Sequence, residues 1–297
     1  MNILITGDRG FFGRHLKRRY TNHEIFVSNT SVRNLNNIEN LYDLNTKKLD
    51  LIFHLAAKTK AGDWCLSHSG DQWIDNQIIN TTILKYWKEY QPQATMVCMG
   101  TSCAYDPKLP LTEDHYLLGS PSDDLLSYAM TKRMLLHGLI AINKQYGLNY
   151  RYYIPSTLYG PDFDLDDSHF IFDLIKKIYR GKKYGEKVEL WGDGLQCREL
   201  IHVDDAIDIM NDTSTMNNQI FNVCSGLEYP IAVYASIICD ILKFNPNKIE
   251  YNPNKYVGVR SKRLNPNKIG NYPCFPKQRD IISGITSTIN SFLDKVE

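Results

Sequence analysis

"NILITGDRGFFG", residues 2–13, is the stretch that decides the fold. Its first five residues are an apolar run that predicts a buried β-strand, and the amphipathic run "FFGRHLKRRY" predicts a helix directly after it. Gly7 and Gly10 stand between them and Gly13 lies in the first turn of the helix, so the three glycines are spaced three residues apart. Glycines in such a turn let the backbone approach a pyrophosphate, which the amides at the helix N-terminus then bind. The stretch predicts a dinucleotide-binding turn, and the alternative is a glycine-rich turn in another α/β fold.

Short apolar runs alternate with amphipathic stretches through the first half of the chain. Strands are expected at residues 2–6, 24–28, 49–56, 95–100 and 148–155, and helices at 11–20, 75–90 and 127–146. Such alternation implies a parallel sheet with helices on both faces.

The pattern changes after Pro155. A polar loop at 156–167 precedes an expected helix at 169–180, and residues 188–210 indicate a strand, a turn, a short strand and the start of a helix. We therefore expect an α/β fold: a Rossmann-type doubly wound parallel sheet with a smaller, interleaved C-terminal α/β substrate domain. The cofactor domain is expected to comprise 1–158 together with 196–225, and the substrate domain 159–195 with 226–297.

Composition narrows the function classes. The 297 residues carry a formal net charge of +1, so no nucleic-acid or anionic-membrane partner is expected. The seven cysteines are odd in number and form no C-x-x-C, which argues against a disulfide framework or zinc site and for a reducing compartment. No apolar run approaches the roughly 18 residues of a membrane span. The start of the chain lacks a signal-peptide pattern, so we expect a cytoplasmic protein.

No metal site is expected either. The acidic loop at 162–167 lacks the spaced glycine and the closing glutamate of a calcium-binding loop.

The choice of cofactor rests on the residues that follow the second strand. An NAD site usually has an acidic residue about 20 positions after the glycines, and "VSNTSVRN" at 27–34 has none. Arg9 lies inside the glycine turn and Arg33 follows the second strand. Guanidinium groups suit the 2′-phosphate of NADP, so NADP(H) is expected. The alternative is that both arginines are solvated surface residues.

Tyr128 and Lys132 stand four residues apart in an expected helix and so share one face. A nearby ammonium favours the phenolate and is expected to lower the pKa of the tyrosine. The pair follows a strand end that carries Thr101, Ser102 and Cys103. Because side chains alternate along a strand, Thr101 and Cys103 are expected to point the same way and Ser102 the other way.

These motifs, taken in order, resemble the extended short-chain dehydrogenases/reductases of the NAD-dependent epimerase/dehydratase family. The matching stretches are "TGDRGFFG" (6–13), "HLAAK" (54–58), "GTSCAY" (100–105), "YAMTK" (128–132), "PSTLYGP" (155–161) and "WGDGLQCRELIHVDD" (191–205). The resemblance covers nearly the whole chain. It is greatest to the GDP-L-fucose synthase group, which epimerises C3 and C5 and reduces C4 of a 4-keto-6-deoxy sugar nucleotide.

The resemblance implies a role for each of five residues. Thr101 matches the hydroxyl that binds the C4 oxygen of the sugar, and Tyr128 the proton donor to that oxygen. Lys132 matches the partner of the tyrosine, which also holds the nicotinamide ribose. Cys103 and His169 match the base and the acid that epimerise C3 and C5. The residues alone leave simpler explanations open: Cys103 as a small core residue and His169 as the start of a helix capped by Asp167 or Ser168.

Further residues are carried over onto the two ligands. The cofactor side comprises Gly7, Arg9, Gly10, Phe11, Phe12, Gly13, Asn29, Arg33, Leu55, Ala56, Ala57, Tyr128, Lys132 and Pro155. The substrate side comprises Ser102, Thr157, Lys177, Trp191, Arg198 and Arg260. Thr157 stands where the family has an asparagine. The implied partner is a nucleotide sugar, a GDP-sugar before a dTDP- or UDP-sugar, and the implied assembly is a homodimer formed through helices around 73–90 and 127–146.

The chemistry explains why this set is needed. A C4 ketone acidifies the protons at C3 and C5, so inversion there needs a base on one face and an acid on the other, and a thiol and an imidazole can both be tuned toward neutral pH. Three alternatives remain: a plain C4-reductase, a redox-neutral epimerase with tightly held NAD, and a cofactor-sensing regulator without activity.

Overall fold

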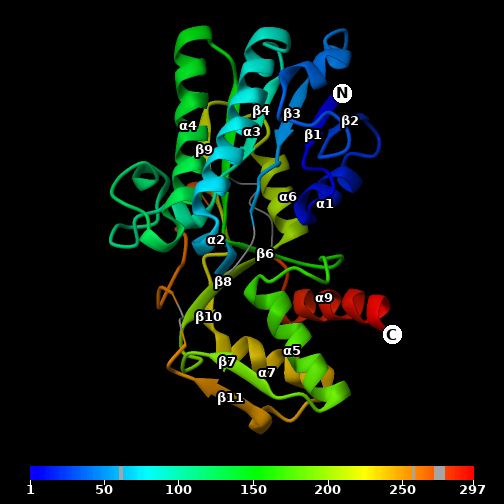
Figure 1. Ribbon diagram of the computed structural model, residues 1–297, viewed down its shortest axis with the longest axis vertical. Coiled ribbons are helices and arrows are strands. Elements are labelled where there is room, and N and C mark those ends of the chain that lie inside the picture. The colour runs from blue at the N-terminus through cyan, green and yellow to red at the C-terminus, as the bar shows by residue number, and fades with distance from the viewer. Residues whose placement is uncertain (60–62, 256–257, 271–277) are drawn as a thin grey trace.

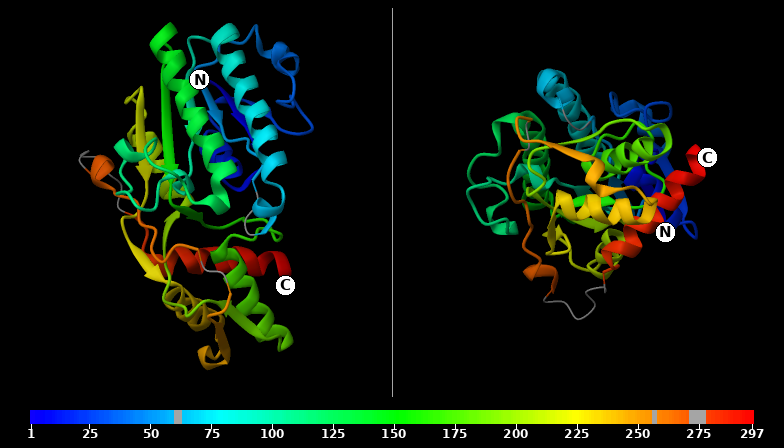
Figure 2. Two further views of the ribbon diagram at one scale, coloured as in Figure 1. Left: turned by 60° about the vertical axis from the view of Figure 1, so that its left-hand side comes forward. Right: turned by 90° about the horizontal axis from the view of Figure 1, so that it is seen from below.

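A computed structural model describes residues 1–59, 63–255, 258–270 and 278–297. Figure 1 shows an elongated molecule with a large sheet and its helices at one end and smaller sheets with further helices at the other. Helix α9 (Ile281–Val296) runs across the junction between the two parts in both Figure 1 and Figure 2. No helix in the described part of the chain is both long and apolar enough to cross a membrane.

The large sheet has six parallel strands, and this confirms the expected fold class. The strands are β1 (Asn2–Thr6), β2 (Glu24–Ser28), β3 (Leu51–His54), β4 (Thr95–Met99), β5 (Tyr150–Pro155) and β9 (Gln219–Val223), in the order β2-β1-β3-β4-β5-β9. Ile5 pairs with Val27 on one side and Phe53 on the other. The chain moves outward from β1 to β2 and then returns to the opposite side of β1 at β3. The carboxyl ends of β1 and β3 therefore form the switch point at which ligands bind in such sheets.

Four helices flank this sheet. They are α1 (Phe11–Arg19), α3 (Ser69–Tyr90), α4 (Leu126–Tyr146) and α6 (Val203–Asp212). Helices α3 and α4 pack side by side, and α1 packs on α6 (Figure 1). The short elements are α2 (Asp63–Ser67), α8 (Asn267–Gly270) and the 3₁₀ turns Ile38–Leu44, Ser102–Ala104, Glu113–His115, Asp123–Leu125 and Pro246–Lys248.

The second part of the molecule has its own sheets and core. Strands β6 (Thr157–Tyr159), β8 (Cys197–His202) and β10 (Glu228–Pro230) form one sheet in the order β10-β8-β6, and β7 (Val188–Trp191) pairs in parallel with β11 (Ile249–Asn252). Helices α5 (Phe170–Tyr184) and α7 (Ile231–Leu242) pack there with α9. The rings of Phe163 and Phe172 stack at 4.2 Å in this core.

The buried apolar residues fall into two clusters. One draws on 3–154, 201–224 and 264–269, and the other on 159–200 and 231–292. The chain therefore passes between the two cores more than once. The domain boundaries given above remain our proposal.

Several expected elements differ in extent from the structure. The strand expected at 49–56 spans only Leu51–His54, and the strand expected at 148–155 begins at Tyr150. The helix expected at 75–90 begins six residues earlier, at Ser69. The helix expected at 169–180 runs on to Tyr184, because the chain first takes the left-handed backbone that ends a helix at Gly185, with φ +70°. The strand expected over 95–100 ends at Met99, and a 3₁₀ turn follows at Ser102–Ala104.

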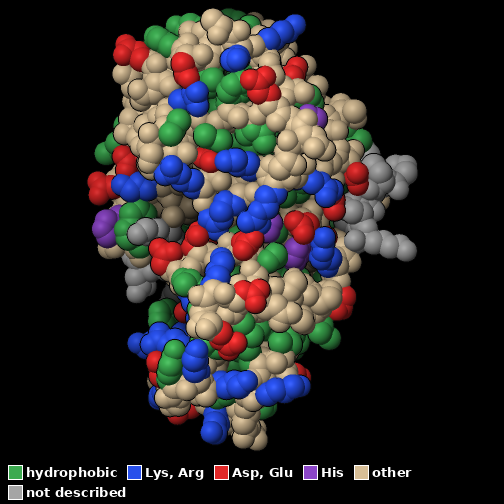
Figure 3. Space-filling view, turned by 90° about the vertical axis from the view of Figure 1, so that its right-hand side faces the viewer, with side chains coloured by type: hydrophobic (Ala, Val, Ile, Leu, Met, Phe, Trp, Pro, Cys, Tyr) green, Lys and Arg blue, Asp and Glu red, His purple; other side chains and the backbone are tan. Residues whose placement is uncertain are grey.

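Ion pairs join the two parts on the face that carries α1. Arg14 pairs with Asp164 at 3.1 Å and Arg18 with Asp162 at 2.5 Å. Figure 3 shows Lys and Arg interspersed with Asp and Glu over this side of the molecule. Asp162 and Asp164 of the acidic loop are thus bound by arginines of α1.

Candidate active site

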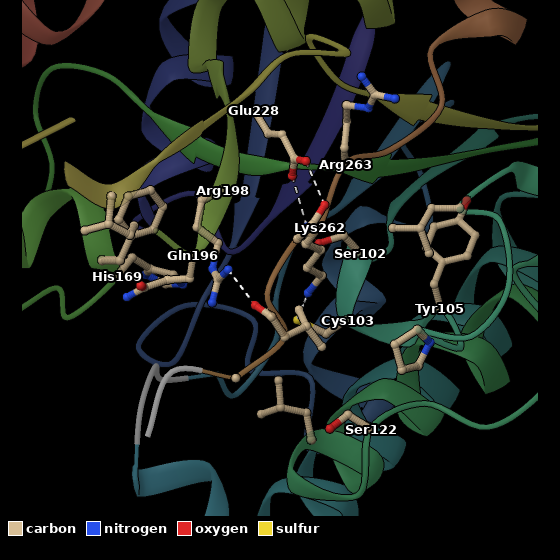
Figure 4. A pocket seen from close by; sticks show the side chains of 18 of the residues that line it. Ser102, Cys103, Tyr105, Ser122, His169, Gln196, Arg198, Glu228, Lys262 and Arg263 are labelled. Atoms are coloured by element: carbon tan, nitrogen blue, oxygen red, sulfur yellow. Dashed lines mark hydrogen bonds between the residues drawn. The ribbon is translucent and has the colours of Figure 1, made fainter. Parts of the chain in front are cut away.

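A pocket of about 980 Å³ lies between the two parts of the molecule. Its walls come from the turn after β4, the following loop to Leu111, the start of α5, strands β7 and β8, and residues 258, 259 and 261–263 (Figure 4). Six of the residues singled out in the sequence line it: Ser102, Cys103, His169, Lys177, Trp191 and Arg198.

A turn after β4, and not the strand that was expected there, orients the Thr101 hydroxyl and the Cys103 thiol. Thr101 caps the 3₁₀ turn, and its Oγ1 accepts a hydrogen bond from the backbone N–H of Cys103 at 3.3 Å. Ser102 and Cys103 both line the pocket. The prediction that side chains alternate here is wrong, because the chain leaves the strand at Met99 and turns helically.

Cys103 is partly buried and has a cation beside it. The ammonium of Lys262 donates a hydrogen bond to Cys103 Sγ at 3.0 Å. Burial alone would raise the pKa of the thiol, but the charge and hydrogen bond of Lys262, with smaller contributions from Thr101 and His169, lower the pKa of Cys103 below its ordinary value. The surroundings therefore favour the thiolate, the form that acts as a base.

His169 lies at the start of α5 and is itself the residue that precedes the first helical turn. Its Nδ1 lies 2.6 Å from Asp167 Oδ1, which also accepts a hydrogen bond from the His169 backbone N–H at 2.9 Å. The hydrogen bond with Asp167 raises the pKa of His169, although burial opposes it. The His169 ring lines the pocket, and its hydrogen bond with Asp167 favours the protonated imidazolium. The helix-start position and a function in the pocket are compatible.

Tyr128 and Lys132 are placed on α4 behind the turn that carries Thr101. The Lys132 ammonium donates to the Met99 carbonyl at 2.9 Å and lies 6.0 Å from the centre of the Tyr128 ring. Burial, and next the charge of Cys103, raise the pKa of Tyr128, while burial lowers the pKa of Lys132 to about 8. The prediction that Lys132 lowers the pKa of Tyr128 is wrong in this structure, because the ammonium is directed to a carbonyl.

The glycine turn meets the tight steric conditions expected of it. Gly7 has φ +74°, and a Cβ on it would lie 2.8 Å from the Ala56 backbone nitrogen. A Cβ on Gly13 would lie 2.3 Å from the Gly7 carbonyl oxygen. Only glycine fits at both positions, so the backbone of β1 and α1 approaches closely at the sheet edge. This cradle fits the pyrophosphate of a dinucleotide.

The other residues expected near the cofactor lie around this cradle or behind it. The backbone N–H groups of Leu55 and Ala56 both donate to Thr6 Oγ1 at 3.1 Å, which holds the segment after β3 against the end of β1. Ala57 follows on that segment, and Pro155 ends β5. The Phe12 side chain is buried in the core and Phe11 packs on His15, so Gly10, Phe11 and Phe12 offer backbone rather than side chains to a ligand.

Arg9 and Arg33, the two arginines expected to bind the 2′-phosphate of NADP, have different surroundings. Arg9 is exposed, and its guanidinium donates to Ser31 Oγ at 3.1 Å. Arg33 has φ +50°, and its guanidinium is held by the Asp43 carboxylate and the Val27 carbonyl. Arg9 is therefore free to turn toward a phosphate, whereas Arg33 must first leave a carboxylate.

One carboxylate of the turn escaped the sequence reasoning. Asp8 is 6% exposed and accepts a hydrogen bond from Asn29 Nδ2 at 2.8 Å. Lys17 lies 3.7 Å away and offsets its charge. The sequence feature that could have drawn attention to Asp8 is its position directly after Gly7.

The substrate-side residues divide between the pocket and its surroundings. Lys177 and Lys255 each place an ammonium over the Trp191 ring, at 6.0 and 5.8 Å. Arg198 donates to the Val259 carbonyl at 2.8 Å. Two expected substrate-side residues are absent from the lining, and so are the expected catalytic residues Thr101, Tyr128 and Lys132. Arg260 is exposed and pairs with Asp193 at 2.9 Å, and Thr157 pairs in β6 with Leu200.

The fold also brings to the pocket several residues that the sequence did not identify as site residues. They are Tyr105, Gln196, Glu228 and Lys262. In the sequence Lys262 stands close to two other basic residues, Arg260 and Arg263. Its neighbour in the structure, Cys103, lies 159 positions away.

Comparisons with known proteins show which family and which individual proteins this chain resembles. Residues 3–224 match the NAD dependent epimerase/dehydratase family. The chain is 28% identical over 309 residues to a GDP-L-colitose synthase of Yersinia pseudotuberculosis, with 99% of each chain covered. It is 25% identical over 314 residues to a GDP-L-fucose synthase of Escherichia coli strain K12, with 98% and 96% covered. A GDP-L-fucose synthetase structure from Naegleria fowleri, bound to NADP, matches with a TM-score of 0.87 at 21% identity, covering 99% of this chain and 93% of that one.

Proposed function

The chain belongs to the NAD dependent epimerase/dehydratase family, and within it we propose an NADPH-dependent enzyme that epimerises C3 and C5 and reduces C4 of a GDP-linked 4-keto sugar. The family and the full-length similarity to GDP-sugar synthases support an enzyme of nucleotide-sugar metabolism. The observation that carries the finer proposal is one pocket with two opposite proton-transfer groups: Cys103 beside Lys262, and His169 beside Asp167.

Epimerisation uses the protonation states that the site favours. Cys103 as a thiolate removes the proton from a carbon next to the ketone, and the electron pair moves onto O4. Hydrogen-bond donors at O4, Thr101 and Tyr128, stabilise that charge. His169 as an imidazolium then returns a proton to the other face of the carbon.

Reduction at C4 uses the same two hydrogen-bond donors at O4, Thr101 and Tyr128. NADPH, when bound, supplies the hydride. The glycine turn and the segment at Ala56 would hold its pyrophosphate, and the Lys132 ammonium, which reaches from α4 to the carbonyl at the end of β4, would hold the ribose. Tyr128 gives its phenolic proton to O4, and its raised pKa keeps that proton in place at neutral pH.

The proposal is tested with NADPH and a panel of 4-keto-6-deoxy sugar nucleotides that carry GDP, dTDP or UDP. We expect NADPH to be consumed, fastest with a GDP-sugar, and deuterium from heavy water to enter the product at C3 and C5. Consumption without deuterium would identify a plain C4-reductase. No consumption with any substrate, together with NAD released on denaturation, would identify a redox-neutral epimerase.

Arg9→Met is expected to weaken NADPH binding by about 10- to 100-fold, because a charge-assisted hydrogen bond contributes about 1.5–3 kcal/mol. NADH has no 2′-phosphate, so its affinity should stay within about twofold. Titration calorimetry with both nucleotides measures this, with Arg180→Met, an exposed arginine of α5, as the control. An equal loss for NADPH and NADH would place Arg9 elsewhere than at the 2′-phosphate.

We also propose a homodimer formed through α3 and α4. Trp73, Ile74 and Ile78 of α3 and Met134 of α4 are each more than 40% exposed, and Gln77 contacts Met134 across the two helices. An exposed apolar face of this kind is typical of an interface. The wild type is expected to sediment as a dimer and Trp73→Glu as a monomer, while Tyr184→Glu, an exposed aromatic residue of α5, should remain dimeric. A monomeric wild type contradicts this proposal.

A further inference from the structure

One segment of the second part, residues 260–265, contributes Ser261, Lys262 and Arg263 to the pocket lining, and we call it the strap. Its backbone is held at several points. The Arg260 carbonyl accepts from the Cys197 N–H at 2.8 Å, the Leu264 N–H donates to Glu199 at 2.8 Å, and the Asn265 N–H donates to the Leu111 carbonyl at 3.1 Å. The strap is thus tied to β8 and to the loop after β4.

Glu228 fixes the middle of the strap. One oxygen of its carboxylate accepts from Ser261 Oγ at 2.7 Å and the other from the Lys262 N–H at 3.1 Å (Figure 4). A lysine side chain normally samples many rotamers. With its backbone held on both sides, Lys262 directs its ammonium to Cys103 Sγ at 3.0 Å.

Arg263 also lines the pocket, but the cation in contact with Cys103 Sγ is Lys262. Three other cations of the lining have partners of their own. His169 is bound through Nδ1 to Asp167, and no hydrogen bond joins it to Cys103 among the residues that the structure describes. Arg198 is directed to the carbonyls of Cys197 and Val259, and Lys177 pairs with Asp173 at 2.9 Å. The remaining titratable groups that act on the thiol, Tyr128 and Tyr116, carry no positive charge.

We propose that Lys262 is a positioning residue for the base: its ammonium holds Cys103 as a thiolate and fixes the sulfur for proton abstraction next to the ketone. This rests on the proposed function, in which Cys103 is the base. The assignment separates the two proton-transfer groups, since the charge that sustains the thiolate comes from the strap and leaves His169 free to act as the acid.

The step balances without a further reagent. The C–H bond breaks, an S–H bond forms on Cys103, and the electron pair moves to O4 of the sugar. Lys262 stays protonated throughout, and its hydrogen bond weakens once the sulfur becomes neutral.

The test is the pH dependence of Cys103 alkylation by iodoacetamide in the protein without substrate, followed by peptide mass spectrometry. An opposite charge at this distance shifts a pKa by about 1–3. Lys262→Met is therefore expected to move the midpoint of the alkylation rate upward by about one pH unit or more, and to slow alkylation at pH 7 about tenfold or more. Lys262→Arg should restore most of the shift, because it keeps the charge. Lys248→Met, an exposed lysine far from the pocket, is the matched control.

Lys262→Gln covers the case in which the methionine variant does not fold, since it keeps a hydrogen-bond donor without the charge. An unchanged midpoint in a folded neutral variant overturns the proposal. So does a higher KM for the nucleotide sugar with an unchanged alkylation profile, because that identifies a diphosphate ligand instead. The readout needs no sugar, so it stands even if no 4-keto sugar is turned over. If one is, the acid limb of the pH profile for deuterium exchange should move upward with the midpoint.

Discussion

Tyr128→Phe is expected to lower the rate of NADPH-dependent C4 reduction by about 10²- to 10⁴-fold, the range in which a positioned general acid contributes. Phenylalanine keeps the shape and burial of the ring and removes only the proton that O4 receives. Burial raises the pKa of Tyr128, so the wild-type phenol stays protonated through neutral pH and rates should not fall on account of Tyr128 until the solution is strongly alkaline.

Single-turnover consumption of NADPH, with a pre-epimerised 4-keto sugar, measures the effect. Tyr153→Phe is the control, because its hydroxyl contacts Thr213 and the Met210 carbonyl inside the core and not the pocket. That variant should lose some stability and keep its turnover. A Tyr128→Phe enzyme within tenfold of wild type would remove Tyr128 as the proton donor.

Cys103→Ser has the second large effect, and it acts on the other half of the reaction. Deuterium exchange from solvent at C3 and C5 should fall by about 10²- to 10⁴-fold. A hydroxyl is a far weaker acid than a thiol, so the ammonium of Lys262 at 3.0 Å does not ionise it. Reduction of a pre-epimerised ketone should change by less than about tenfold, since Thr101, Tyr128 and Lys132 are intact.

Exchange is measured by mass spectrometry of the sugar in heavy water, and reduction by NADPH absorbance. Cys197→Ser provides the matched control: it is another partly exposed cysteine, whose thiol contacts the Leu195 carbonyl. Equal losses of exchange and reduction in Cys103→Ser would contradict separate functions for the thiol and the phenol.

The local pattern of the sequence predicted the fold well. The strands at Asn2–Thr6 and Glu24–Ser28 begin and end where their apolar runs do, and the glycine turn joins β1 to α1 as expected. These features depend on residues that are neighbours in the chain, so the periodicity of apolar residues and the positions of glycines suffice to predict them.

The site was predicted less fully, for physical reasons that differ from residue to residue. The turn at Thr101 follows from a side chain that caps its own backbone, which the apolar pattern does not encode. The spacing of Tyr128 and Lys132 is correct, but burial and the Met99 carbonyl decide how they are charged. Arg33 is held by the carboxylate of Asp43, a contact that the sequence pattern did not predict. Lys262 reaches the thiol only because the strap returns to the pocket, and no local signal encodes that return.

The strap also makes Cys103 a reporter of completed folding. The thiol and its ammonium are separated by 159 positions, and the strap is bonded to both parts of the molecule. Until residues near the C-terminal end have docked, Cys103 remains an ordinary thiol. On this proposal, rapid alkylation at neutral pH appears only once the strap has docked, and its time course in a refolding experiment records that docking step.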